Sequence, residues 1–259
     1  MSDLLLQRRD ARGVVTLTLN DPARFNALGS AMLAALQDAL DALSLDDSVR
    51  VVVLAAEGKA FCAGHNLKEM AALSTCSDYE ALFTQCSRMM LSIAKLPVPV
   101  IARVQGLATA AGCQLVAQCD LAVASIDASF ATSGINYGLF CATPSVPLVR
   151  NVPFKQAMEM LLTGDFIDAH TAQMQGLVNR VAALNDLDAQ VEQLVQSIVH
   201  KPAAAVRMGK ALLYRQREMG LESAYLLAAE VMACNMMDAD AQEGAQAFAQ
   251  KRQPQWRCT

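Results

Sequence analysis

Two short loops of similar composition hold the residues whose types and spacing could support catalysis. They are residues 61–67, FCAGHNL, and residues 109–114, TAAGCQ. Each loop follows an apolar segment, and its small residues lead into a helix whose first backbone N–H groups are free to face another molecule. If the loops are neighbours in space, one N–H from each could bind a single oxygen as an oxyanion hole. The alternative is two ordinary strand-to-helix turns.

The segments around these loops predict the elements that must position them. Alternating or continuous apolar runs predict β-strands, and Ala- and Leu-rich stretches between them predict helices. Because strands and helices alternate along the chain, we expect an α/β fold with a mostly parallel sheet and helices on its outer faces. The expected strands are residues 14–19, 51–55, 100–104 and 121–124, and the expected helices are residues 30–43, 78–94 and the stretch that begins at the second loop.

The chain becomes predominantly helical from about Pro153. FKQAMEMLLT predicts a helix that ends at Gly164, residues 168–175 predict a short helix, and LVNRVA is one last strand-like segment. Two or three helices rich in Ala, Leu and Met follow. No linker rich in Pro, Gly or Ser divides the chain, and no internal repeat is evident. We therefore expect a core over residues 1–195 and a helical C-terminal region over residues 196–259.

The composition limits the kinds of protein that this chain can be. Its 259 residues are 54% hydrophobic and 18% charged, which is typical of a folded globular protein. The net charge of −4 argues against a nucleic-acid partner, which needs a basic surface. Eight scattered cysteines without a C-x-x-C pair, and three histidines without an H-E-x-x-H pattern, predict reduced thiols and no metal site. No apolar run is long enough to span a membrane and the N-terminus has no signal-peptide pattern, so we expect a cytoplasmic protein.

Longer segments show a family resemblance. FCAGHNLKEM, AAGCQLVAQCDLAVAS and LLTGDFIDAHTAQMQGLVNRV resemble signature regions of the crotonase, or enoyl-CoA hydratase/isomerase, superfamily, and TLTLNDPARFNAL and AFAQKRQPQW are similar to its two ends. The resemblance covers essentially the whole chain. It implies a crotonase-like ββα spiral core, a helical trimerisation region, and assembly as a homotrimer or a dimer of trimers. It also implies an acyl-CoA thioester as ligand, with coenzyme A as part of the substrate and no other cofactor.

The same resemblance assigns roles to residues of this chain. The backbone N–H groups of His65 and Ala111 would form the oxyanion hole that holds the thioester carbonyl. Ala111 stands where the family usually has glycine. The coenzyme A moiety would lie against Phe25, Ala63, Asn66, Leu67 and Lys68, with Phe248 and Lys251 reaching it from a neighbouring subunit.

The chain departs from the family where the hydratases carry two glutamates. By the resemblance, one of them falls at Gln114 and the other at Gly134, and residues 130–149 contain no acidic residue. General acid–base catalysis typically contributes about 10²- to 10⁴-fold per group, and an amide has no useful pKa for it. Hydration by a glutamate pair is therefore excluded as the mechanism.

Three side chains remain as candidate catalytic groups. His65 could act as an acid or base near neutral pH, or it could contribute only its backbone N–H. Cys141 could act as an acid, base or nucleophile if a neighbouring base lowered its pKa, or it could be a small buried side chain. Gln114 could hydrogen-bond a water or a carbonyl. The methylmalonyl-CoA decarboxylases of the family are similar in having a His at the position of His65, although their tyrosine aligns with Cys141 here.

Three functions are compatible with these observations. The first is an acyl-CoA-processing enzyme of the enoyl-CoA hydratase/isomerase type, a lyase or isomerase that stabilises a thioester enolate. The second is a decarboxylase-like reaction, which needs no general base because loss of CO₂ itself generates the enolate. The third is a catalytically silent acyl-CoA-binding protein.

Some polar residues outside the two loops have structural interpretations. We expect Asp120 to cap an element or hydrogen-bond a loop, and Cys113 and Cys119 to be packed in the core. The basic residues of one C-terminal segment are expected to form a solvated helix face. They are Arg207, Lys210, Arg215 and Arg217.

Overall fold

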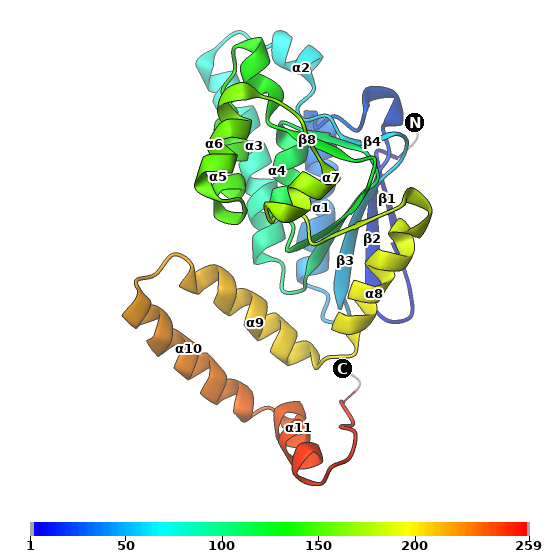
Figure 1. Ribbon diagram of the computed structural model, residues 1–259, viewed down its shortest axis with the longest axis vertical. Coiled ribbons are helices and arrows are strands. Elements are labelled where there is room, and N and C mark those ends of the chain that lie inside the picture. Colours follow the sequence, from blue (N-terminus) through cyan, green and yellow to red (C-terminus); the bar gives the residue numbers. More distant parts are fainter. Residues whose placement is uncertain (1–2, 258–259) are drawn as a thin grey trace.

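The computed structural model describes residues 3–257 of the chain (Figure 1). Six of the described strands form the larger of two sheets, in the order β1-β2-β3-β5-β7-β10. β1 and β2 pair antiparallel, and the other neighbours pair parallel. The mostly parallel sheet expected from the alternating pattern is confirmed. The strands are β1 (Leu5–Arg9), β2 (Val14–Leu19), β3 (Val51–Ala56), β5 (Val100–Val104), β7 (Leu121–Ser125) and β10 (Arg180–Ala182).

A second sheet of four short strands has the order β4-β6-β8-β9. β4, β6 and β8 are parallel neighbours, and β9 pairs antiparallel with β8. Each of β4, β6 and β8 directly follows a strand of the larger sheet and leads toward a helix, so the unit strand–strand–helix repeats as the predicted ββα core requires. These strands are β4 (Ala60–Cys62), β6 (Leu107–Thr109), β8 (Ser129–Ala131) and β9 (Ile167–Asp168).

Helices cover both faces of the larger sheet. Leu33 of α1, Met89 of α3 and Leu115 of α4 share one buried cluster with side chains from the strands, and Val191 of α8 belongs to a cluster on the opposite face. All six residues of β3 are buried, which is why the sequence of this strand is continuously apolar. The helices of the core are α1 (Ser30–Ser44), α2 (Leu67–Ala71), α3 (Cys76–Lys95), α4 (Ala111–Gln118), α5 (Ala142–Asn151), α6 (Phe154–Thr163), α7 (Ala169–Met174) and α8 (Leu187–Val199).

Helix α5 was not expected, because its sequence ATPSVPLVRN contains two prolines. Pro144 lies in the first turn, where a backbone N–H would have no partner within the helix. Pro147 lies inside the helix and removes one hydrogen bond, but both prolines and Leu148 are buried. Asn151 Nδ2 also donates to Pro147 O at 2.8 Å and to Ala117 O at 2.7 Å, which ties the end of α5 to α4. Packing against the core therefore outweighs the local preference of the sequence.

Three further helices form a C-terminal arm, residues 203–257, that runs along one end of the core (Figure 1). The predicted boundary after residue 195 falls inside α8, which packs on the sheet, so the division into two regions stays a prediction. Many large apolar side chains of the arm are exposed, and assembly as a trimer or a dimer of trimers also stays a prediction. The helices are α9 (Ala203–Gln216), α10 (Leu221–Met236) and α11 (Ala239–Ala249), and the exposed side chains include Leu213, Leu221, Tyr225, Leu226, Met232, Met237 and Phe248.

A buried ion pair fastens the arm to the core. Lys210 Nζ of α9 lies 2.6 Å from Asp120 Oδ2 and also donates to the carbonyl oxygens of Ile93 and Val98, each at 2.9 Å. Asp120 accepts the Val100 N–H at 2.7 Å and the Tyr214 hydroxyl at 3.0 Å, so its expected role in holding a loop is confirmed. The expectation of a solvated helix face is wrong for Lys210, which is only 7% exposed. Burial lowers the pKa of Lys210 and raises that of Tyr214.

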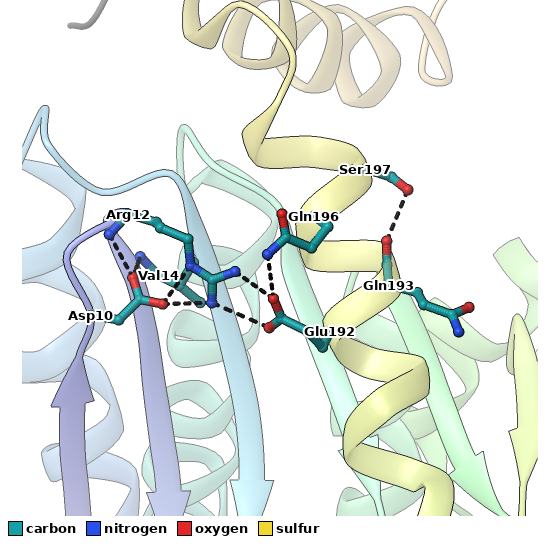
Figure 2. A network of polar contacts seen from close by, with 7 residues as sticks. All are labelled: Asp10, Arg12, Val14, Glu192, Gln193, Gln196 and Ser197. Atoms are coloured by element: carbon teal, nitrogen blue, oxygen red, sulfur yellow. Dashed lines mark hydrogen bonds and ion pairs between the residues drawn. The ribbon is translucent and has the colours of Figure 1, made fainter.

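A second set of polar contacts joins α8 to the β1–β2 hairpin, as Figure 2 shows. Arg12 binds Asp10 at 2.6 Å and also pairs with Glu192 of α8, whose carboxylate accepts a hydrogen bond from Gln196 at 2.6 Å. The contacts with Arg12 lower the pKa of Glu192. Because these side chains are largely exposed, we expect the network to orient α8 more than to stabilise it.

Within residues 3–257, no helix is both long enough and apolar enough to cross a membrane. The same residues contain no group of three or more His, Cys, Asp or Glu side chains placed to hold a metal ion. The seven cysteines in this part of the chain are all free thiols, and Cys113 and Cys119 are buried, which confirms that both are packed.

The buried ion pair leads to a prediction about stability. Replacing Asp120 by Ala leaves the Lys210 ammonium buried without a counter-charge, so the free energy of unfolding should fall by about 3 to 5 kcal/mol. Asp188→Ala is the matched control, because its pair with Arg103 involves a carboxylate that is 78% exposed and should cost no more than about 1 kcal/mol. Urea unfolding measures both. Similar losses in the two variants would contradict the assignment of Asp120 as the anchor of the arm.

Candidate active site

The two loops identified from the sequence meet at the edge of the smaller sheet. They follow the parallel neighbours β4 and β6, so both lie at the carboxyl ends of their strands. A Cβ atom added at Gly112 would lie 2.0 Å from Cys62 O, and one added at Gly64 would lie 3.2 Å from Ala111 N. Gly64 also has a φ of +90°, which side chains rarely allow. The two loops therefore meet, as the oxyanion-hole interpretation requires, and glycine makes this contact possible.

This contact brings two free backbone donors to the same edge. Ala111 is the first residue of α4, so its N–H has no partner within the helix. The N–H of Leu28 donates to Gly64 O at 2.7 Å, which holds the first loop in place while leaving the His65 N–H unused. Among residues 3–257, the His65 N–H has no hydrogen-bond partner, and the Ala111 N–H has none outside α4.

The residue between β6 and α4, Ala110, has a strained backbone conformation. Ala110 has φ +50° and ψ −119°. Residues other than glycine rarely adopt this backbone conformation, which costs about 1 to 3 kcal/mol. Its N–H donates to Ala131 O at 2.9 Å, which helps to fix the turn. Backbone strain of this kind is concentrated at functional sites, where the surrounding structure holds an unusual conformation in place.

A cavity of about 420 Å³ lies against the two loops. Its wall is mainly apolar, and none of its lining residues is Asp, Glu, Lys or Arg. Of the predicted site residues it includes Ala63, His65, Leu67, Ala111 and Cys141. The other lining residues are Met70, Phe83, Leu107, Thr109, Ala110, Ser133, Gly134, Asn136, Tyr137, Leu139, Phe140, Ala142, Thr143, Pro144 and Phe166.

A larger hollow of about 750 Å³ lies between α9 and the core. Its wall includes Asp120 and Lys210, whose charges are paired with each other. The smaller cavity is the better candidate site because it alone of these two adjoins the loops that present the free N–H groups.

The ring of His65 is held by the protein. Nδ1 lies 3.2 Å from Leu28 O, and because a carbonyl oxygen only accepts, Nδ1 carries the proton of the neutral ring. Nε2 is therefore without a proton; it is buried and has no hydrogen-bond partner among the described residues. The ring meets Phe83 edge-on at 5.5 Å, and burial lowers the pKa of His65. The ring thus anchors the first loop through Leu28 O, and its use in proton transfer stays a prediction.

Cys141 lies in the cavity wall as expected, at the residue that precedes α5. Burial raises the pKa of its thiol, so at neutral pH it keeps its proton. A nucleophilic role would require a lowered pKa, and the environment has the opposite effect. The neutral thiol remains capable of donating a proton.

The protein has no room for a side chain at Gly134. A Cβ atom added there would lie 2.6 Å from Leu139 O and 2.8 Å from Cys141 Sγ. The carbonyl of Leu139 and the thiol of Cys141 take up the space next to Gly134, and the departure from the hydratases at this position stays a prediction.

Gln114, the other position predicted to differ from the hydratases, is 3% exposed and is not one of the cavity-lining residues. Its Oε1 is buried and finds no partner in the described part of the chain. A direct contact of Gln114 with a ligand stays a prediction.

The chain is similar to several known proteins. The sequence profile of the enoyl-CoA hydratase/isomerase family matches residues 9–258. Enoyl-CoA hydratase domain-containing protein 3, mitochondrial, of Xenopus laevis is 45% identical over 94% of this chain and 83% of its own length. The crystal structure of an enoyl-CoA hydratase from Mycobacterium smegmatis has a TM-score of 0.98 and 63% identity, covering 98% of this chain and 99% of that one. Human enoyl Coenzyme A hydratase domain-containing protein 3 has a TM-score of 0.93 and 43% identity, over 98% and 100%.

The chain belongs to the enoyl-CoA hydratase/isomerase family. Membership confirms the resemblance read from the sequence motifs, and the similarity to solved structures confirms the crotonase-like α/β fold. The cytoplasmic location expected from the sequence stays a prediction, and the names of several relatives call them mitochondrial.

The residues expected to bind coenzyme A in this family member fall into two groups. Ala63 and Leu67 line the cavity, and the Ala63 N–H donates to Phe25 O at 3.0 Å, so Phe25 lies beside the first loop. Asn66 caps α2 by accepting hydrogen bonds from the N–H groups of Lys68 and Glu69. Phe248 and Lys251 lie at the far end of the C-terminal arm and do not line the cavity of their own chain. Their contact with coenzyme A, from a neighbouring subunit, stays a prediction.

The sequence analysis did not identify two polar features that shape this site. Asn26 is fully buried, and its Nδ2 donates to Glu57 O and Ala60 O, each at 2.9 Å, while its Oδ1 accepts the Asp21 N–H. It therefore holds the turn before α1 against the strand β4. The second feature is a contact between the hydroxyls of Thr109 and Ser133 in the cavity wall. Asn26, Thr109 and Ser133 look like ordinary polar residues in the sequence, and only the fold reveals their partners.

The crowding at Gly134 can be tested by mutation. Gly134→Ala should lower the free energy of unfolding by about 1 to 3 kcal/mol, because its methyl group would overlap Leu139 O and Cys141 Sγ. Gly209→Ala is the matched control, since nothing lies within 4 Å of an added Cβ there and an alanine inside α9 should leave the stability unchanged or raise it by up to about 1 kcal/mol. Chemical unfolding of both variants decides the point. Equal stability of Gly134→Ala and the wild type would contradict it.

The environment of His65 predicts a pH dependence. Its pKa in the folded protein lies below the ordinary value of 6.5, so the folded state binds a proton less readily than the unfolded chain. This difference in the pKa of His65 stabilises the folded state. Its contribution is complete above pH 6.5 and is lost as the pH falls through the pKa of the folded protein. In His65→Asn, which keeps a donor near Leu28 O but does not titrate, this part of the decline should disappear. His200→Asn, at the exposed end of α8, is the control and should retain the wild-type decline in a pH series of unfolding curves.

Proposed function

We propose that this chain binds an acyl-CoA thioester and polarises its carbonyl group, so that a thioester enolate can form. The observation that carries the proposal is the meeting of two loops that present the unpartnered N–H groups of His65 and Ala111 beside one cavity. Membership of the enoyl-CoA hydratase/isomerase family supports it.

The physical reason lies in where the charge develops. When a thioester becomes an enolate, negative charge accumulates on the carbonyl oxygen, and preorganised N–H dipoles stabilise it without further rearrangement. The apolar wall of the cavity strengthens this interaction because little water competes for the oxygen. An apolar wall also suits an acyl chain.

The choice of reaction follows from the neutral groups in the wall. No carboxylate lines the cavity, so steps that need a carboxylate base are disfavoured. Decarboxylation of a malonyl-type thioester is the reaction that needs none: the C–C bond to the carboxylate breaks, CO₂ leaves, and the electron pair passes to the enolate oxygen. The carbon then requires one proton, and the Cys141 thiol in the cavity wall carries one.

The second candidate is an acyl-CoA-binding protein without catalytic activity. The observation that favours it is the wholly uncharged wall of the cavity, which offers no strong acid or base. Both candidates require thioester binding, and they differ in whether the bound carbonyl is polarised and converted.

Infrared difference spectroscopy of a bound acyl-CoA with a ¹³C-labelled thioester carbonyl tests the proposal directly. Hydrogen bonds from His65 and Ala111 should lower the carbonyl stretching frequency relative to free ligand. Replacing residue 111 by its α-hydroxy acid exchanges the N–H for an oxygen and should remove much of this shift. The same exchange at Ala117, in the last turn of α4, is the matched control and should leave the shift unchanged. A bound ligand with an unshifted carbonyl would contradict the oxyanion hole.

Mass spectrometry of reactions with an acyl-CoA panel then separates the candidates. The panel holds 2-enoyl-, 3-enoyl- and methylmalonyl-CoA esters, and chromatography separates isomers of equal mass. Loss of the mass of CO₂ supports decarboxylation, and the exchange at residue 111 should then slow turnover by about 10²- to 10³-fold. Gain of the mass of water would overturn the exclusion of hydration. Binding with a shifted carbonyl and no product would favour the binding protein.

A further inference from the structure

The first turn of α1 is capped by a side chain from another helix. Gly29, the residue before α1, has no side chain with which to cap it. Glu69 of α2 takes that role, because its Oε2 accepts the Ser30 N–H at 2.9 Å. Its Oε1 accepts a hydrogen bond from Asn66 Nδ2, the residue before α2, at 2.8 Å. One carboxylate therefore joins the starts of both helices, where a negative charge is favourable.

The glycine before α1 leaves room for this carboxylate. Gly29 has a φ of −82°, which any residue can adopt, so its backbone conformation does not require glycine. A Cβ atom added there would instead lie 2.3 Å from Glu69 Oε1, and the three atoms nearest to it all belong to the Glu69 carboxylate. The side chain of Glu69 thus explains why residue 29 has none.

The segment that Glu69 holds also orients the first donor of the proposed oxyanion hole. Leu28 and His65 form a β-bridge, and the Leu28 N–H donates to Gly64 O at 2.7 Å. This carbonyl and the His65 N–H belong to the same peptide group, which is planar and trans, so the two bonds point in opposite directions. The contact that fixes the carbonyl therefore also fixes the direction of the His65 N–H.

We infer that Glu69 is a positioning residue for the oxyanion hole: its carboxylate holds the start of α1, and through Leu28 it sets the direction of the His65 N–H. The inference rests on the proposed thioester site. Glu69 does not line the cavity, so it acts through the backbone and not by contact with a ligand. Because its side chain is exposed to solvent, its removal should leave the protein folded and disturb only the alignment of the donor.

Infrared difference spectroscopy of bound butyryl-CoA with a ¹³C-labelled thioester carbonyl, at saturating ligand, tests the inference. In the wild type, the carbonyl stretching frequency should be lower than in free ligand. In Glu69→Ala this shift should fall to about half or less, because a misaligned hydrogen bond is much weaker and one of the two donors loses its alignment. Glu69→Gln should retain more of the shift, since its amide oxygen can still accept the Ser30 N–H.

Gly29→Ala disturbs the same contact from the other side. Its methyl group would overlap Glu69 Oε1, so it should displace the carboxylate and reduce the shift as Glu69→Ala does. Once residue 69 is alanine, the methyl group has space, and the double variant should lose little more than Glu69→Ala alone. A double variant that shows the sum of both losses would overturn the inference.

Asp78→Ala is the matched control. Asp78 is likewise an exposed carboxylate at the start of a helix, where it accepts the Thr75 N–H at 3.1 Å, and it should keep the wild-type shift when it is removed. An unchanged shift in Glu69→Ala, or an equal loss in Asp78→Ala, would overturn the inference while leaving the oxyanion hole intact. A wild type that binds no ligand, or binds it without a shift, would instead overturn the proposed thioester site, and the inference with it.

Discussion

The geometry of the site depends on the close approach of Gly112 to the carbonyl oxygen of Cys62. An added Cβ atom would lie only 2.0 Å from that oxygen, so the start of α4 can rest on the end of β4 only because glycine is present. This contact sets the position of Ala111 relative to His65 across two parallel strands. The turn at Ala110 fixes the start of α4, and the buried amide of Asn26 holds the turn before α1 against β4. The site is thus a property of backbone packing before any side chain contributes.

Burial gives the site its chemical character. It lowers the pKa of His65 and raises that of Cys141, so both side chains are uncharged at neutral pH. No Asp, Glu, Lys or Arg lines the cavity to offset this burial with a charge. In the proposed function, backbone N–H dipoles and not carboxylates stabilise the bound thioester. The packing of Cys141 against Gly134 shows that this neutrality is built into the fold around the cavity.

The C-terminal arm depends on a different kind of interaction. Lys210 and Asp120 are buried together, and each of them has further hydrogen bonds that offset the loss of water. The arm carries many exposed apolar side chains, in contrast to the polar outer surface of α8 with its Arg12–Glu192 contact. Specific polar contacts thus fix the position of α9 and α8 relative to the sheet, and apolar packing provides most of the stability of the core.

The sequence by itself determined the α/β class and the main strands and helices, because apolar periodicity is a local signal, and its motifs indicated the family. It left open whether the two loops meet or form two ordinary strand-to-helix turns. It did not reveal α5, where buried packing overcomes two prolines, or the buried state of Lys210, whose partner Asp120 lies 90 residues away. The lack of space at Gly134, the proton position on His65 and the Thr109–Ser133 contact were likewise decided by tertiary structure. Each depends on atoms that are distant in sequence, and only the folded chain brings such atoms together.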